Sequence, residues 1–191
     1  MMTDSIPGTS PEPRRITARL LLLLSGLLIG CDYVPSSTAP TGPVSGLTPV
    51  DRAGFDQVIA SHAGKVILVD FWASWCPPCQ RAFPHTVDLY GQHRQQGFEV
   101  VSVSLDAAID ESKAQRFLQT VGADFDNLIS IWGNSLKSYS EFEIPDAIPF
   151  YTLYDRQGRL RYRFSPLFPP GQQGNENPAS IDQRVLELLA E

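Results

Sequence analysis

A pair of cysteines, Cys76 and Cys79, follows an apolar run that begins at Val66, and this combination limits the possible folds of the chain. The run has the length and the β-branched content of a buried strand. Two thiols separated by two residues can close a small disulfide on the first turn of a helix, where unpaired N–H groups and the helix dipole favour the reactive thiolate. A disulfide that only braces a fold gains little from so short a loop. The spacing therefore indicates redox chemistry.

The rest of the chain alternates between helix-like and strand-like patterns. Helices are expected over residues 51–62, 76–96 with a kink at Pro84, 112–121 and 133–142. Strands are expected over residues 66–71, 99–105, 150–154 and 160–164, the last two joined as a hairpin. Ser180 and Gln183 form a capping-box pattern before a final helix. Strands that alternate with helices and end in a hairpin predict an α/β sandwich with a mixed sheet.

The first 31 residues have the pattern of a secretory signal. Three arginines between residues 14 and 19 precede an apolar stretch that ends at Cys31, and this stretch is shorter than the roughly 20 apolar residues of a spanning helix. Residues 28–31, Leu-Ile-Gly-Cys, resemble a bacterial lipobox, which implies lipidation of Cys31. An ordinary signal peptide with an incidental cysteine and an uncleaved membrane anchor are the alternatives.

The remaining sequence divides into a tether and a domain. Residues 32–49 are rich in Pro, Ser, Thr and Gly, and they carry too little apolar surface to fold, so a flexible tether is expected. The folded domain is expected over residues 50–191, with a long Pro- and Gly-rich loop at 166–177. The formal net charge is -6, and the basic residues form no long block, so no nucleic-acid partner is expected.

Residues 69–79, Val-Asp-Phe-Trp-Ala-Ser-Trp-Cys-Pro-Pro-Cys, resemble the active-site segment of thioredoxin-fold thiol–disulfide oxidoreductases. The lipobox, the tether and the insertion before Ile148 and Pro149 resemble the membrane-tethered TlpA/ResA-like branch of that family. The resemblance covers residues 47–165. It implies a thioredoxin-like three-layer sandwich, in which helices flank a mixed central sheet.

The resemblance also assigns roles to four residues. Cys76 would be the attacking thiolate and Cys79 the buried resolving thiol, so the redox group is their disulfide and no cofactor is expected. Asp70 matches the buried acid that accepts the proton of the resolving cysteine, and burial would raise its pKa; a strand-end residue that caps a turn is the alternative. Pro149 matches the cis-proline beside the disulfide, with Pro145 as its rival.

Five further residues are expected to line the substrate groove. They are Trp75, Pro77, Pro78, Ile148 and Phe150. Phe150 stands where the broader family commonly has threonine, so its ring is expected to narrow or reshape the groove. Ala82 stands where many relatives of the tethered branch have an acid, so Asp70 is expected to take over proton handling. Trp72 is expected in the core.

Metal binding is the competing explanation for a Cys-x-x-Cys segment. The chain has no second pair of thiols, and His62, His85 and His93 lack zinc-finger spacing, so no metal site is expected. His85 is interpreted as a surface residue.

The two prolines between the cysteines bear on the direction of the reaction. Neither Pro77 nor Pro78 has an N–H group that could stabilise the Cys76 thiolate. The pKa of Cys76 is therefore expected in the upper part of the roughly 3.5–7.5 range of activated cysteines. A less stabilised thiolate makes the dithiol a better reductant.

These observations predict a lipid-anchored protein-disulfide reductase on the extracytoplasmic, periplasmic side of a bacterial membrane. The resemblance implies apocytochrome c and copper-site assembly proteins as partners, and a membrane thiol electron donor of the DsbD/CcdA type. Two alternatives remain. One is a peroxidase of the peroxiredoxin type, although Cys76 lacks the Pro-x-x-x-Thr/Ser-x-x-Cys setting; the other is a non-enzymatic tethered binding module with a structural disulfide.

Overall fold

The computed structural model describes residues 46–145, 147–168 and 174–191. The expected signal peptide, the lipidation at Cys31 and most of the expected tether lie outside these residues. Within them, no helix is both long enough and apolar enough to cross a membrane.

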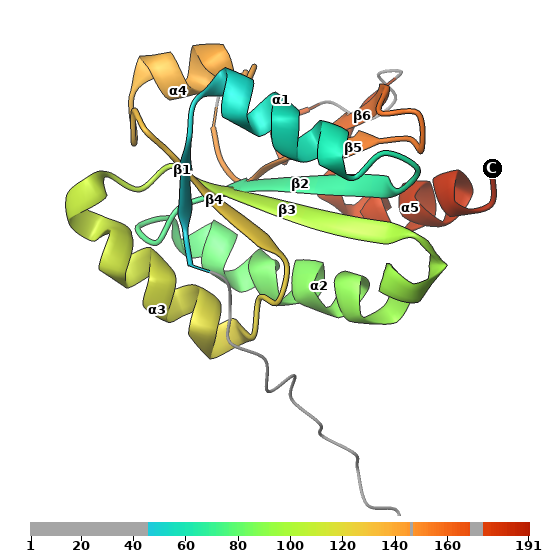
Figure 1. The fold of residues 1–191 in the computed structure, drawn as a ribbon, viewed down its shortest axis with the longest axis horizontal. Coiled ribbons are helices and arrows are strands. Elements are labelled where there is room, and N and C mark those ends of the chain that lie inside the picture. The colour runs from blue at the N-terminus through green and yellow to red at the C-terminus, as the bar shows by residue number, and fades with distance from the viewer. Residues whose placement is uncertain (1–45, 146, 169–173) are drawn as a thin grey trace, which may run out of the picture. The chain divides into compact units, whose positions relative to one another are not determined.

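A mixed sheet runs through the centre of the domain, in the order β1-β4-β3-β2-β5-β6-β7 (Figure 1). Its strands are β1 (Thr48–Val50), β2 (Val66–Trp72), β3 (Phe98–Ser104), β4 (Asp126–Ser130), β5 (Phe150–Tyr154), β6 (Leu160–Phe164) and β7 (Asn175–Glu176). The pairs β1–β4, β4–β3, β3–β2 and β6–β7 are parallel, whereas β2–β5 and β5–β6 are antiparallel. The carboxyl ends of β2, β3 and β4 therefore lie at the same edge of the sheet, and the cysteine pair follows β2 there.

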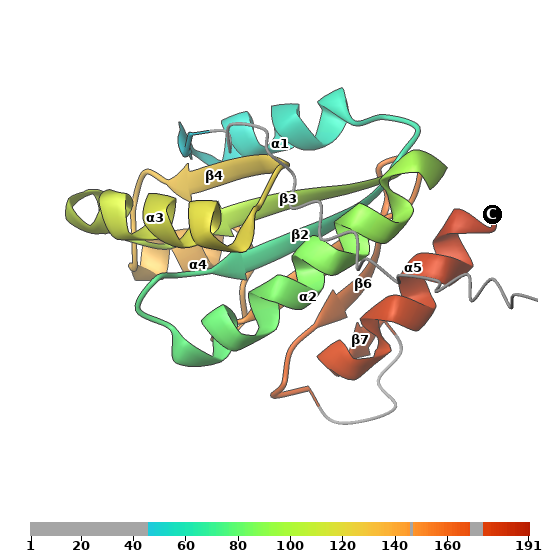
Figure 2. The same ribbon diagram turned by 90° about the horizontal axis from the view of Figure 1, so that it is seen from below.

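Helices cover both faces of the sheet. On one face lie α1 (Arg52–Ser61) and α4 (Leu136–Glu141), and on the other lie α2 (Pro77–His93) and α3 (Glu111–Val121), as Figures 1 and 2 show. The last helix, α5 (Ile181–Leu189), shares a cavity with α2 and therefore belongs to the second face. Short 3-10 turns occur at Arg94–Gln96, Ala108–Asp110 and Pro178–Ser180. This three-layer arrangement confirms the predicted fold class.

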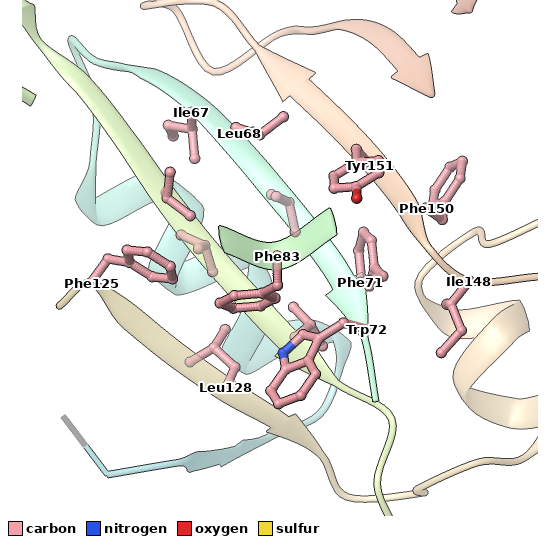
Figure 3. Close-up of a cluster of buried hydrophobic side chains, with 14 of the residues drawn as sticks. Ile67, Leu68, Phe71, Trp72, Phe83, Phe125, Leu128, Ile148, Phe150 and Tyr151 are labelled. Atoms are coloured by element: carbon pink, nitrogen blue, oxygen red, sulfur yellow. The ribbon is translucent and has the colours of Figure 1, made fainter. Parts of the chain in front are cut away.

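The strand β2 is buried along its whole length, and its consecutive side chains point into opposite layers. The ring of Phe71 lies 6.1 Å from that of Phe55 on α1. Trp72 lies 4.9 Å from Phe83 on α2 and 4.9 Å from Phe117 on α3, and Figure 3 shows its indole beside Phe83. Burial on both faces is typical of a central strand in an α/β sheet. Trp72 is thus a core residue, as predicted.

Three strands, β1, β4 and β7, are not predicted by the sequence patterns. β1 has only three residues and contains Pro49, and it begins two residues inside the segment expected as tether. In β4, the polar residue Asn127 interrupts the apolar pattern by which a buried strand is recognised, although its side chain is fully buried. Its side chain accepts a hydrogen bond from Ser102 and donates to the carbonyls of Ala123 and Phe125, which satisfies the amide inside the core.

The C-terminal region differs from expectation in two places. Ser180 occupies the N-cap position of α5, but its side chain makes no capping hydrogen bond, because its hydroxyl donates to the carbonyl of Asn177. The capping-box prediction is therefore wrong. The segment expected as a loop at 166–177 contains β7, and its residues 169–173 lie outside the described residues.

Candidate functional site

Cys76 and Cys79 form a disulfide at the start of α2, with a Cα–Cα distance of 5.3 Å. Cys76 is the N-cap residue of the helix, in an extended conformation, and Pro77 and Pro78 occupy the first two helical positions. Proline is favoured at such a position because an N–H group there would have no helical acceptor. The backbone N–H of Cys79 donates to Cys76 Sγ at 3.3 Å. The sulfur of Cys76 therefore takes the place that a capping oxygen has in other helices.

Both cysteines are largely covered in this disulfide form. Cys79 is 1% exposed, as expected for a resolving thiol, and Cys76 is 4% exposed. The Sγ atom of Cys76 lies 3.8 Å from the carbonyl oxygen of Ile148, so the segment before β5 covers it. The neighbouring Trp75 is 44% exposed, and both intervening prolines are exposed. The disulfide thus lies just beneath a surface that Trp75, Pro77 and Pro78 form.

The segment that covers the disulfide contains a cis peptide bond between Ile148 and Pro149. Pro149 is buried and Pro145 is exposed, so the structure favours Pro149 over its rival. Phe150 does not shape a groove as expected. Its ring is fully buried, 5.8 Å from the ring of Phe71, because the antiparallel pairing of β5 with β2 places these two residues opposite each other. Figure 3 shows both rings on the same side of the sheet, with Ile148 nearby.

Asp70 lies in the middle of β2 and is 1% exposed. This position excludes the alternative that it caps a turn at the strand end. Thr86 on α2 donates to Asp70 Oδ2 at 2.8 Å. The other carboxyl oxygen, Oδ1, has no hydrogen-bond partner among the described residues. Burial raises the pKa of Asp70 to about 7, and the Thr86 hydrogen bond opposes this rise only in part.

Asp70 and the disulfide share one interface between β2 and α2. Cys79, Phe83 and Thr86 all belong to the buried side of α2, and the hydrogen bond from Thr86 places Asp70 against that side. A carboxyl group with a pKa near 7 can both hold and release a proton at neutral pH. The arrangement therefore combines a helix-capping sulfur, its buried disulfide partner and a buried titratable acid.

A cavity of about 250 Å³ lies between α2, α5 and the sheet. Its lining includes Ala82, Thr86 and Tyr151. Burial raises the pKa of the Tyr151 phenol, and the negative charge of Asp70 raises it further. The small side chain of Ala82 thus lines open space next to Thr86 and Tyr151, the two residues that interact with Asp70.

The structure also brings forward residues that the sequence patterns do not single out. Thr86 follows Cys79 by seven residues, which is two helical turns, so its face could have been read from the helical period. Asp106, just after β3, holds Ser74 by two hydrogen bonds, and no local pattern marks it. His85 is exposed and pairs with Asp182 of α5 at 2.7 Å, in line with its interpretation as a surface residue.

The described part of the chain contains no group of three or more His, Cys, Asp or Glu side chains arranged to hold a metal ion.

Comparisons with known proteins agree with this geometry. The profile of the Redoxin family matches residues 34–180. Thiol-disulfide oxidoreductase ResA of Geobacillus kaustophilus is 28% identical over 151 residues, which cover 76% of this chain and 82% of the relative. ResA of Halalkalibacterium halodurans is 34% identical over 98 residues, which cover 51% of this chain and 54% of the relative. The chain thus spans about half the length of that second relative.

Solved structures show the same similarity. A thiol:disulfide interchange protein DsbE from Chlorobium tepidum is 28% identical with a TM-score of 0.53, over 69% of this chain and 84% of that chain. The thioredoxin domain of a thiol-disulfide oxidoreductase from Bacteroides vulgatus has a TM-score of 0.53 at 18% identity, over 68% of this chain and 83% of that chain, and this likeness shows the fold alone. The chain belongs to the Redoxin family and is a thiol–disulfide oxidoreductase of the ResA/DsbE type.

Proposed function

We propose that the protein is a lipid-anchored, extracytoplasmic reductase of protein disulfides that works through the dithiol of Cys76 and Cys79. The observation that carries this proposal is the position of the cysteine pair. Cys76 caps α2 and receives the N–H of Cys79, while Asp70, with a pKa of about 7, lies buried between the same helix and β2.

The proposed cycle begins with the reduced protein. The Cys76 thiolate attacks one sulfur of a partner disulfide, forms a mixed disulfide, and releases the other partner sulfur as a thiolate that takes up a proton. Asp70 then accepts the proton of Cys79. The Cys79 thiolate attacks Cys76 Sγ, the Cys76–Cys79 disulfide forms, and the second partner thiolate leaves and is protonated. The partner gains two electrons and two protons.

The start of α2 supports the reducing direction. With Pro77 and Pro78 at the first two positions, the N–H of Cys79 is the donor that reaches Cys76 Sγ. Fewer donors stabilise the thiolate less, and a less stabilised dithiol gives up its electrons more readily. The cis segment at Ile148 and Pro149 faces the disulfide and, with Trp75, would contact the partner chain.

Partners and location extend this proposal. The resemblance to the tethered branch supports apocytochrome c or copper-site assembly proteins as partners, with lipid on Cys31 as the anchor. Because extracytoplasmic compartments are oxidising, each turnover needs fresh electrons, and a membrane thiol donor of the DsbD/CcdA type would supply them by reducing the Cys76–Cys79 disulfide.

Mixed-disulfide trapping tests the mechanism. In Cys79→Ser, Cys76 can still attack a partner disulfide, but no second thiol resolves the mixed disulfide. This variant should therefore accumulate partner adducts that dithiothreitol reduces. The matched variant Cys76→Ser should form none. The unsubstituted protein should reduce insulin disulfides, and both variants should be inactive. Adducts on Cys76→Ser, or reductase activity in that variant, would contradict the assigned roles.

A separate variant tests the anchor. Cys31→Ser should move the protein from the membrane fraction to the soluble extracytoplasmic fraction and leave insulin reduction unchanged, because residue 31 is remote in sequence from the redox pair. An unchanged membrane fraction in Cys31→Ser would contradict lipidation at this residue.

A further inference from the structure

The structure contains a second buried acid near the redox segment, and the proposed cycle does not use it. Asp106 follows β3 and is fully buried. Its carboxyl group accepts hydrogen bonds from the Ser74 amide at 2.8 Å, the Ser74 hydroxyl at 2.6 Å and the Ser104 hydroxyl at 2.7 Å. Among residues 46–145, 147–168 and 174–191, Asp106 forms no ion pair with a basic side chain. A buried carboxyl group is costly unless it is hydrogen-bonded, so these donors account for its presence there.

Three polar groups of Ser74 take part in this network. Its amide and its hydroxyl both donate to Asp106, and its carbonyl accepts from the side-chain amide of Gln80. Ser74 lies two residues before Cys76, and Gln80 comes directly after Cys79. The chain of bonds from Asp106 through Ser74 to Gln80 therefore spans the whole Cys-x-x-Cys segment and connects it to the end of β3.

Backbone contacts reinforce the same connection. The amide of Leu105 donates to the carbonyl of Trp72 at 2.8 Å, and the amide of Cys76 donates to that of Ala73 at 3.1 Å. The segment at Asp106 and Ala107 is also closely packed. A Cβ atom added to Gly133 would lie only 3.0 Å from the Cα of Ala107, so the loop after β4 fits closely against this segment.

We propose that Asp106 is a positioning residue of the redox reaction, which acts through Ser74 to hold Cys76 at the N-cap of α2. The inference rests on the proposed function. Cys76 Sγ receives the Cys79 N–H only while Cys76 keeps its extended N-cap conformation. Ser74 and Trp75 form the short connection that sets this conformation, and of these two residues Ser74 is the one bound to the core. Without the Asp106 hydrogen bonds, Ser74 and Trp75 become more mobile. The Cys76 thiolate then accepts the Cys79 N–H for a smaller fraction of the time.

The test measures the reactivity of Cys76 directly. The reduced full-length protein is alkylated with iodoacetamide over a range of pH. The rate is read as modification of Cys76 itself by fragment-ion mass spectrometry, because Cys79 lies on the same peptide and only the fragment ions distinguish the two sites. Ser74→Ala removes one of the two bonds to Asp106. It should slow alkylation at neutral pH about fivefold, the equivalent of one hydrogen bond, and move the midpoint of the pH profile upward.

Asp106→Asn should slow alkylation at least as much as Ser74→Ala, because an amide offers one acceptor oxygen where the carboxyl group offers two. A purely electrostatic influence has the opposite sign, since removal of a negative charge favours the thiolate. The double variant should react within about twofold of Asp106→Asn, because both changes act through the same bonds. Unchanged or faster alkylation in either single variant would overturn the proposal. So would a double variant whose rate is lowered by the product of the two single effects.

A control separates positioning from general destabilisation. Asp155 is another buried acid, 1% exposed, and it follows β5 at the opposite end of β2, where Tyr154 pairs with Ile67. Asp155→Asn should lower the midpoint of urea unfolding but leave the Cys76 alkylation profile in place. Insulin reduction by the unsubstituted protein reports on the proposed function independently, so an inactive protein and a failed positioning role give different results.

Discussion

At the scale of single residues, burial controls the protonation of Asp70. The carboxyl group has a pKa of about 7 because desolvation outweighs the Thr86 hydrogen bond. In the unfolded chain its pKa returns to the ordinary value of 3.8. The folded protein therefore binds more protons than the unfolded chain between about pH 4 and pH 7, and its stability falls as pH rises through this window.

Asp70→Asn should remove this pH dependence. Between pH 5 and pH 8 the ionisation of Asp70 should lower the free energy of unfolding by roughly 2.5 kcal/mol. Urea unfolding of the disulfide form at these two pH values measures the loss. The asparagine variant should show a loss smaller by that amount, and it should be more stable than the unsubstituted protein at pH 8.

Two further variants check the cause. Thr86→Val removes the hydrogen bond that favours the ionised carboxyl group, so the pKa of Asp70 should rise and the loss of stability should move to higher pH. Asp155→Asn should not change the loss of stability between pH 5 and pH 8. Hydrogen bonds from the backbone and side chain of Arg159 lower the pKa of Asp155, so Asp155 does not titrate in this window. An identical loss in Asp70→Asn and the unsubstituted protein would show that another group causes it.

At the scale of secondary structure elements, the start of α2 is decided by its first four residues. Cys76 caps the helix, the two prolines provide backbone that fits the first turn without N–H groups, and Cys79 provides the first donor. These residues are neighbours in sequence, which is why the position of the helix and the small disulfide loop can be predicted from the sequence. β4 cannot be predicted in this way, because its polar side chains can be buried only when residues from other parts of the chain satisfy their hydrogen bonds.

Pro78→Ala should restore a donor at the second helical position, from which the N–H group can reach a capping side chain. A hydrogen bond to a charged group is worth about 1.5 kcal/mol or more. The pKa of Cys76 should therefore fall by about one unit, which ultraviolet absorbance of the thiolate can follow, and the dithiol should become a weaker reductant.

Pro77→Ala is the matched control for this change. It also removes a proline, but the N–H group at the first helical position does not point at the capping side chain, so the pKa of Cys76 should move less. Equal shifts in the two variants would indicate that chain flexibility, and not a new donor, is responsible.

At the scale of the whole molecule, the site is assembled from segments far apart in the chain. Ile148, 72 residues after Cys76, covers its sulfur. Asp106, 32 residues after Ser74, holds the redox loop. The sheet order brings β2, β3 and β5 together as neighbours, so the carboxyl ends of β2 and β3 and the start of β5 meet at one place.

The fold also defines where the domain begins. A chain that starts at Gly46 should keep the stability and the insulin reductase activity of the full protein, because β1 and the buried Leu47 and Val50 remain. A chain that starts at Asp51 loses the β1–β4 pairing and two buried side chains. It should be less stable by about 3 kcal/mol or more, as measured by urea unfolding. Equal stability of the two chains would show that β1 is not part of the cooperative unit.

The local features of this protein can be predicted from its sequence: the buried strand β2, the helix that follows it, the redox pair between them, and the α/β class. Each of these rests on a period or a motif that neighbouring residues express. Three other features emerge from the folded arrangement: the Phe150 ring enters the core, Thr86 binds Asp70, and Asp106 holds Ser74. These contacts join residues on different elements, and burial and hydrogen-bond partners arise only when the sheet brings those elements together.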